Sequence, residues 1–404
     1  MRYILLRMKR FCGFITGFIF FIGGIFKLMD PVGAGLVMKE YFEFLHIGFM
    51  DFAAKPAGVL IALLETAIGT ALVTGIWRRL TAISALVLQG FFTILTLFLV
   101  IFNPEMDCGC FGEAIHLTHL QTFLKNIVIC ILLVIYIFPM KALGRPLKKK
   151  YVTFVAVMVS VAAFTVYSWI YIPLVDFTEF KPSAALQAGN AFDTAEEDTY
   201  EAVFIYEKDG IQERFDLDHL PDSTWTFVST ETVMKEESGL STINLSFYGQ
   251  NGEYMDELAA EGKVMVVSVY DPDMRPARWN HVAEFISKAE ETGFTSFVLV
   301  SATAEQMEDI ISGLTEQTAD IIGSHLYFSD YKTLITLNRS NAGVTFFSDG
   351  YLIRKWSRAS MPDTEELNEI LTGDETEVVI WHDTKGSLCF QGFLLYVFAV
   401  MLLL

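Results

Sequence analysis

Apolar residues are crowded at both ends of this chain, whereas its middle has the mixed pattern of a water-soluble domain. A helix of roughly 20 apolar residues is long enough to cross a bilayer. Runs close to that length occur at Phe11–Met29, Pro56–Ile76, Leu80–Phe102, Thr122–Pro139 and Tyr151–Pro173, and a shorter one at Cys389–Leu404. The pattern predicts an α-helical membrane bundle with five spans and a sixth helix at the C-terminus.

The segment 256–373 alternates between strand-like and helix-like patterns. Val264–Tyr270 is continuously apolar, as in strands buried on both faces, and Ala277–Thr292 is amphipathic, as in a surface helix. Further strands are expected at Phe294–Val300, Gly343–Phe347 and Tyr351–Trp356, and further helices at Ala304–Leu314, Tyr331–Leu337 and Pro362–Leu371. This order predicts an α/β domain of three layers.

Four units are therefore expected along the chain. The bundle covers residues 1–175 and the α/β domain residues 256–373, and the C-terminal helix covers 388–404. Between the first two lies a segment, 176–255, with a strand pattern at Tyr200–Tyr206 followed by the turn signal Lys208-Asp209-Gly210. We expect this segment to be a small β-rich connector.

Basic residues orient the predicted spans. They cluster before the first span, at Arg78 and Arg79 after the second, and in the loop 141–150 after the fourth. Because Lys and Arg favour the cytoplasmic ends of spans, all three clusters fit one side of the membrane. The N-terminus is then cytoplasmic, and the loops 30–55 and 103–121 and the segment 176–386 lie outside. In a bacterium, this places the chain in the inner membrane and the soluble domain in the periplasm.

Composition supports this picture. The mean hydropathy of the 404 residues is +0.41, which is high for a soluble protein of this length. The net charge is −19, with acidic residues dominating the segment 176–383. A strongly acidic outer domain argues against nucleic acid as a partner and against docking on anionic lipid. The bundle requires lipid contact, and the outer domain leaves room for an extracytoplasmic protein partner.

A Cys-x-Cys motif is the most informative chemical signal. Cys108, Gly109 and Cys110 lie in the expected outer loop, where disulfides persist. A disulfide across one intervening residue departs from relaxed geometry, and strain makes a disulfide easier to reduce. The motif therefore favours thiol–disulfide exchange. A turn stiffened by a bridge, or two unreactive thiols, remain the alternatives. The other cysteines, Cys12, Cys130 and Cys389, fit buried helix positions.

Several stretches resemble the DoxX-like membrane family, and within it the MauE (methylamine utilisation) type. They are Gly23–Pro31, Glu65 with Gly69, Arg78-Arg79, Asp107–Gly112 and Lys125-Asn126. The whole chain resembles a fused form found in Bacteroidetes-type bacteria, in which a thioredoxin-like domain without cysteines follows the fifth span. The stretch Asp271–Pro276 stands where a Cys-x-x-Cys would be, and Asn341-Ala342-Gly343 where a cis-proline would be. This domain is then a binding or docking surface.

What the resemblance implies is a role in maturing an extracytoplasmic protein, as the MauE type does for methylamine dehydrogenase. The family's helix bundle is likened to quinone-linked thiol oxidases such as vitamin K epoxide reductase, so a quinone is the candidate cofactor. This chain departs from that enzyme in its Cys-x-Cys spacing and in having no second outer cysteine pair.

Other polar residues near the spans have competing interpretations. Glu65 lies mid-span, where an ionisable group marks either a proton or quinone site or a hydrogen bond with Gln89 or Thr93. Lys27 and Asp30 lie at the outer end of the first span, where a snorkelling lysine with an aspartate at the helix end fits better than a role beside the Cys pair. Two histidines, His116 and His119, fit interface positions better than a Cys₂His₂ metal site, because Cys-x-Cys is tighter than zinc spacing.

Three functions follow. The first is a membrane thiol–disulfide oxidoreductase or maturation factor, with Cys108, Cys110 and Glu65 as catalytic residues. The second is a non-catalytic scaffold or receptor that acts through the thioredoxin-like surface. The third is a bundle that handles a small molecule or metal through His116 and His119.

Overall fold

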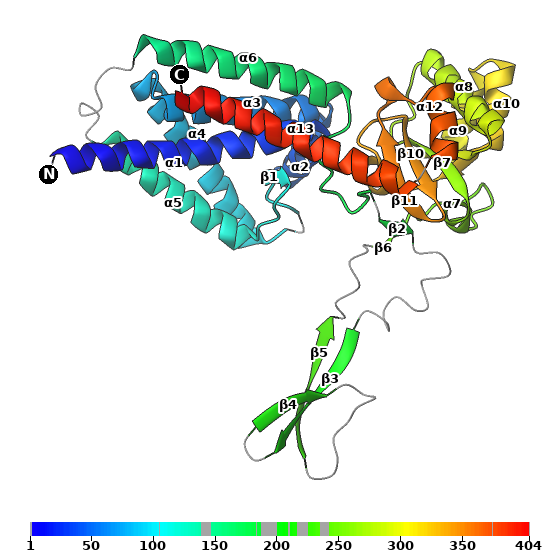
Figure 1. Cartoon of the computed structure of the whole chain (residues 1–404), viewed down its shortest axis with the longest axis horizontal. Coiled ribbons are helices and arrows are strands. Elements are labelled where there is room, and N and C mark those ends of the chain that lie inside the picture. Colours follow the sequence, from blue (N-terminus) through cyan, green and yellow to red (C-terminus); the bar gives the residue numbers. More distant parts are fainter. Residues whose placement is uncertain are drawn as a thin grey trace.

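The computed structural model describes residues 2–104, 106–138, 147–182, 184–186, 200–208, 211–215, 225–234, 242–373 and 375–403. A bundle of long helices lies beside an α/β domain (Figure 1). The N- and C-terminal ends of the chain lie at the same end of the bundle, and the α/β domain lies beyond the opposite end. The predicted fold class, a helical membrane bundle with an α/β domain, is confirmed.

Within the described residues, six helices are long and apolar enough to cross a membrane. They are α1 (Arg2–Met29), α3 (Ala54–Thr74), α4 (Arg78–Phe102), α5 (His119–Ile137), α6 (Lys148–Ile170) and α13 (Glu375–Leu403). Each coincides with a predicted run to within a few residues, except that α1 begins at Arg2 and not at the expected Phe11, and α13 begins well before the expected Cys389. Its apolar part, Thr384–Leu402, is the sixth span.

The packing of α1 against α3 depends on small residues. Gly69 on α3 faces α1 so closely that an added Cβ would lie 2.5 Å from the Phe21 nitrogen and 2.6 Å from the Gly17 oxygen. Helices in a membrane gain little from the hydrophobic effect between them and rely on such close van der Waals contact. The tight approach of backbones brings Phe21 and Ile25 of α1 into a fully buried core.

The segment 30–55 was expected as an outer loop, but it is largely helical. It contains α2 (Pro31–Phe44) and a short 3₁₀ helix, η1 (Gly48–Ala53). Asp30 caps α2, because its Oδ1 accepts a hydrogen bond from the Gly33 nitrogen at 2.9 Å, and Pro31 occupies the first helical position. Asp followed by Pro is a helix start signal, and the sequence prediction missed it.

The α/β domain is built on a mixed sheet with the strand order β6-β2-β11-β10-β7-β8-β9. Parallel pairing joins β7 (Lys263–Val269), β8 (Thr295–Val300) and β9 (Leu326–Phe328). The next strand, β10 (Gly343–Ser348), is antiparallel to both β7 and β11 (Tyr351–Trp356), and its Gly343 pairs with Ser268. The two short strands β2 (Ala185–Leu186) and β6 (Thr242–Ile243) complete the edge.

Helices cover both faces of this sheet. Trp279 of α8 (Pro276–Thr292), Ile322 of α10 (Glu316–Ser324) and Leu367 of α12 (Thr364–Thr372) belong to the core on one face. The core on the other face includes Leu334 of α11 (Tyr331–Leu337) and Ala259 of α7 (Glu257–Ala260). The expected three layers are confirmed. The remaining helical elements are α9 (Ala304–Ser312) and η4 (Arg358–Ser360), and α10 and β9 were not predicted.

The expected connector is divided between two sheets. β3 (Tyr200–Lys208), β4 (Ile211–Phe215) and β5 (Thr226–Met234) form a separate antiparallel sheet in the order β4-β3-β5. By contrast, β2 and β6 at the two ends of the segment join the main sheet. The turn at residues 209–210 and most of the stretch 220–228 lie outside the described residues.

Replacing Gly69 tests the close α1–α3 packing. We expect Gly69→Ala to lower the free energy of unfolding by about 1–3 kcal/mol, because the new methyl group would overlap the α1 backbone. Gly90→Ala on α4 is the matched control, since an added Cβ there meets nothing within 4 Å. Thermal unfolding in detergent measures both variants, and equal melting temperatures would contradict close packing at Gly69.

Candidate functional site

A cavity of about 350 Å³ lies inside the bundle and reaches the Cys-x-Cys loop. Its wall is mainly apolar and comes from α1 to α5. The polar side chains among its lining residues are Lys27, Glu65, Gln89, Thr96, Lys125 and Asn126, together with Cys108 and Cys110 at the loop. A cavity of this size with few, convergent polar groups is typical of a small-molecule site.

Glu65 and Lys27 form an ion pair in the wall of this cavity. The Lys27 Nζ lies 2.8 Å from both carboxylate oxygens of Glu65. The Lys27 side chain is only 13% exposed, and the Glu65 side chain only 7%. Two interpretations from the sequence are therefore wrong: the partner of Glu65 is not Gln89 or Thr93, and Lys27 turns into the bundle instead of snorkelling. A charge in an apolar interior is costly unless it is paired in this way.

Gln89 presents an unused donor to the same cavity. Its side chain is buried, and its Nε2 has no hydrogen-bond partner within the described part of the chain. The neighbouring Asn126 is satisfied by contrast, because its Nδ2 donates to the Thr96 Oγ1 at 3.2 Å. Since a buried polar group normally has a partner, the Gln89 amide suits a ligand that carries an oxygen acceptor.

The Cys-x-Cys loop is held by α2. Gly109 and Gly112 adopt positive φ angles of 57° and 59°, which glycine tolerates best. A Cβ on Gly109 would run into Val37 of α2, so this position also requires glycine for space. The Tyr41 hydroxyl of α2 donates to the Cys108 carbonyl at 3.0 Å. β1 (Cys110–Glu113) then leads the chain back along α1.

Cys108 faces a histidine. Its Sγ lies 3.0 Å from the Nδ1 of His119, and the Nε2 of the same ring lies 3.0 Å from the Pro104 carbonyl. A carbonyl only accepts, so in the neutral ring Nε2 carries the proton and Nδ1 offers its lone pair to the thiol. Burial raises the pKa of the Cys108 thiol, which keeps it protonated at neutral pH and makes it the donor.

The sequence suggested His119 only as a metal ligand or an interface residue, and not as the partner of Cys108. His119 begins α5, and only the fold of the loop brings it against Cys108. The signal in the sequence is weak: an eleven-residue separation between a cysteine and a histidine. The other histidine, His116, is exposed, with its Nδ1 3.3 Å from the Asp107 carboxylate. The described residues contain no cluster of three or more His, Cys, Asp or Glu side chains suited to a metal ion.

Both cysteines of the motif are free thiols in this structure, with Cys108 buried and Cys110 half-buried. Access from outside is therefore unequal, and Cys110 is the more approachable sulfur. Next to it, the Phe111 ring lies under the Lys125 ammonium of α5 at 4.7 Å. These contacts hold the loop in the cavity wall, so Cys108 and Cys110 line the same cavity as Glu65.

Two family models match parts of the chain. Residues 2–139 match the family model of the methylamine utilisation protein MauE, and residues 200–237 match a domain of unknown function, DUF8463. No curated protein and no solved structure matches the chain. The MauE match covers the first four spans, the Cys-x-Cys loop and His119. The protein is thus a multi-pass membrane protein whose bundle is similar to MauE.

Removing one charge of the buried ion pair tests its role in stability. We expect Lys27→Met or Glu65→Gln to destabilise the bundle by about 3–5 kcal/mol, because an unpaired charge or polar group is left in an apolar wall. The double variant should regain much of this loss. Lys149→Met, at an exposed lysine of α6, is the control. Thermal unfolding in detergent measures all four, and additive losses in the double variant would contradict a direct pair.

The contact between Cys108 and His119 is tested by thiol alkylation. Because the pKa of Cys108 is raised by burial, its alkylation should be slow at pH 7 and accelerate as the pH rises. We expect His119→Leu to slow it further by about tenfold, as loss of a proton acceptor does at minimum. His116→Leu is the matched control. Peptide-resolved mass spectrometry reads the rates, and equal effects of both substitutions would show that His119 does not assist the thiol.

Proposed function

We propose that this protein is a membrane thiol–disulfide oxidoreductase that supports the maturation of an extracytoplasmic protein. The observation that carries the proposal is the Cys108 sulfur held 3.0 Å from the His119 ring beside a second cysteine, at a membrane cavity. A cysteine paired with a base is the arrangement that activates a thiol. The match to the methylamine utilisation protein MauE favours maturation of a partner protein as the role of this exchange, and methylamine utilisation is the first pathway to test.

The exchange step begins with the Cys108–Cys110 disulfide. A thiolate of the partner attacks the Cys110 sulfur, which is the accessible one, and forms a mixed disulfide. The Cys108 sulfur leaves with the bonding electron pair, and His119 passes to it the proton that the first partner thiol released on ionising. The second partner sulfur then gives up its proton and attacks the first partner sulfur in the mixed disulfide, so that Cys110 leaves with the bonding electron pair and takes up that second proton. The partner loses two electrons and gains a disulfide, and both cysteines of the motif become thiols.

Regeneration requires an acceptor for two electrons and two protons, and we propose a quinone bound in the cavity. The cavity volume suits a quinone ring, since ligand pockets start at roughly 300 Å³. The free Gln89 amide would donate to a quinone oxygen, and the Glu65–Lys27 pair would provide charge and a proton near the ring. Cys108 and Cys110 line the same space, so electrons have a short path.

The proposed orientation places this chemistry outside the cytoplasm. The basic clusters favour a cytoplasmic N-terminus in a bacterial inner membrane, which makes the Cys-x-Cys loop and the α/β domain periplasmic. The order of three parallel strands, an antiparallel hairpin and a last helix supports a thioredoxin-like origin for the α/β domain. Because the segment 151–388 contains no cysteine, this domain would act by binding and not by exchange.

Thiol trapping in intact cells tests the exchange reaction. We expect Cys108 and Cys110 to be protected from a membrane-impermeant reagent until mild reduction, because a strained outer disulfide is easily reduced. In isolated membranes, a reduced dithiol peptide should drive reduction of a soluble quinone analogue at a rate that Cys108→Ser or Cys110→Ser lowers by at least about 100-fold, as loss of a nucleophile does. Cys130→Ser, on α5, is the control.

The scaffold alternative predicts a different pattern. A chain with both Cys108→Ser and Cys110→Ser would then support partner maturation fully, whereas removing residues 176–387 would abolish it. Permanently free thiols in cells, together with full activity of the double serine variant, would overturn the oxidoreductase proposal.

A further inference from the structure

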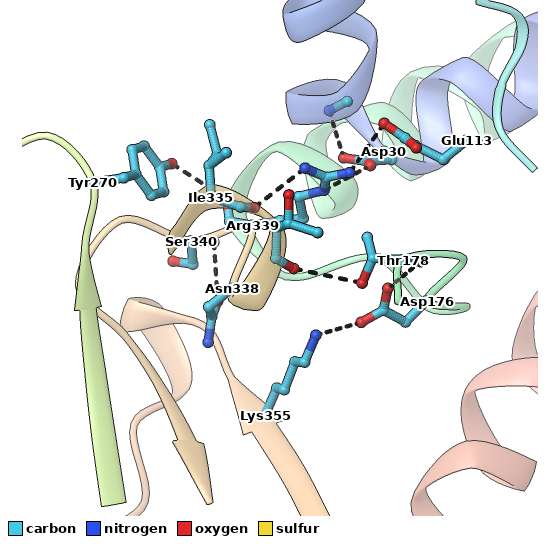
Figure 2. A network of polar contacts seen from close by, with 12 residues as sticks. Asp30, Glu113, Asp176, Thr178, Tyr270, Ile335, Asn338, Arg339, Ser340 and Lys355 are labelled. Carbon is cyan, nitrogen blue, oxygen red and sulfur yellow. Dashed lines mark hydrogen bonds and ion pairs between the residues drawn. The ribbon is translucent and has the colours of Figure 1, made fainter. Parts of the chain in front are cut away.

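The α/β domain touches the bundle through a buried arginine. Arg339 lies between α11 and β10, and its side chain retains 6% of its exposure. Its Nε lies 3.0 Å from the Asp30 Oδ2, and its NH2 lies 3.1 Å from the Glu113 Oε1 (Figure 2). Asp30 caps α2, and Glu113 ends β1, three residues after Cys110. One guanidinium therefore joins the domain to both structures that hold the Cys-x-Cys loop.

The charges of this contact are matched. Burial disfavours the guanidinium charge, but the carboxylates of Asp30 and Glu113 outweigh it and raise the pKa of Arg339. Charge-assisted bonds from arginine to carboxylate are among the strongest that side chains form. A third bond, from the Arg339 NH1 to the Ile335 carbonyl at 3.2 Å, fixes the arginine to its own domain.

The loop that carries Arg339 is preorganised. The buried Asn338 side chain donates to the carbonyls of Val344 and Trp356 at 3.0 and 3.1 Å, and its Oδ1 accepts from the Ser340 nitrogen at 3.0 Å. The Tyr270 hydroxyl donates to the Arg339 carbonyl at 3.3 Å, and burial raises the pKa of Tyr270 to about 12, which keeps it a donor. An arginine on a rigid loop loses little entropy on pairing.

The end of the sheet that contacts the bundle is the end at which α/β domains normally bind ligands. Open α/β sheets bind partners beyond the carboxyl ends of their parallel strands. Here Tyr270 and Asp271 follow the carboxyl end of β7, and Asn341 bonds reciprocally with Asp271 at 2.8 and 3.0 Å. Arg339 belongs to the same edge, so the bundle of the same chain occupies the position of a partner.

Two further contacts fasten the domain. The Lys39 ammonium of α2 lies 5.5 Å from the centre of the Tyr331 ring of α11. On the other side, the buried Lys355 of β11 pairs at 2.6 Å with Asp176, which follows α6 (Figure 2). Burial disfavours the charge of Asp176, but Lys355 outweighs this effect and lowers its pKa. The α/β domain thus contacts the rest of the chain at three separate ionic or cation–π sites, formed by Arg339, Lys39 and Lys355.

We propose that the α/β domain binds the Cys-x-Cys loop of its own chain, with Arg339 as the positioning residue that ties the loop and the start of α2 to the sheet edge. This inference rests on the proposed function. If the Cys-x-Cys loop exchanges disulfides with a protein partner, the contact made by Arg339 sets how far the loop opens toward that partner. The domain is then a control element for Cys108 and Cys110, and its binding edge is not a free receptor surface.

Alkylation of Cys108 in the full-length protein tests the dock. Because Cys108 is buried, its labelling in the reduced protein requires the loop to open. Arg339→Met should raise the labelling rate by about tenfold, because loss of the contacts favours the open state, and Arg339→Lys should give a smaller rise. Arg278→Met removes an exposed arginine of the same domain and should leave the rate unchanged. Fragment-ion mass spectrometry separates Cys108 from Cys110 on the same peptide and from Cys12, Cys130 and Cys389.

A second, more conservative variant tests the same contact in case Arg339→Met misfolds. Glu113→Gln keeps the size of the side chain and should raise the labelling rate in the same direction, with hydrogen exchange faster in residues 106–113 and 338–343. Unchanged labelling and exchange in both Arg339→Met and Glu113→Gln would overturn the dock. If labelling changes as expected but the double serine variant still supports maturation, the dock stands and the oxidoreductase function fails.

Discussion

The requirement that every charge inside an apolar bundle have a partner organises the membrane part of this protein. Lys27 on α1 and Glu65 on α3 satisfy each other at 2.8 Å, and this pairing is reachable only because glycines bring the two helices close together. The pair in turn gives polarity to one wall of a cavity that is otherwise apolar. The proposed quinone site depends on this arrangement.

The second organising element is α2, which contacts both the reactive loop and the soluble domain. Val37 and Tyr41 hold the Cys-x-Cys loop, while Asp30 and Lys39 contact the α/β domain. A helix with contacts to two partners transmits a displacement of one to the other, provided that both contacts are rigid. The preorganised Asn338 loop and the capped start of α2 provide that rigidity. The α/β domain and the membrane site are therefore connected through α2.

The two cysteines of the site lie in different environments. Cys108 is made a poor nucleophile by burial and is offered a base by His119, so its reactivity depends on one ring in one orientation. Cys110 is half-buried and has no such partner among the described contacts. This inequality suits a protein in which one sulfur meets the partner and the other faces the cavity. An exposed pair with equal environments would not separate these two roles.

Much of the architecture follows from the sequence alone. The six apolar helices, most strands and helices of the α/β domain and the Cys-x-Cys motif are visible as local patterns of hydrophobicity and spacing, because membrane spans and buried strands are defined by their own residues. Three features required the tertiary structure: Glu65 pairing with Lys27, His119 facing Cys108, and Arg339 reaching Asp30 and Glu113. Asp30 and Arg339 are separated by 309 positions, and no local pattern records such a contact. Side-chain pairs of this kind are decided by which helix faces pack together, so the chemistry of the site emerges only when the chain has folded.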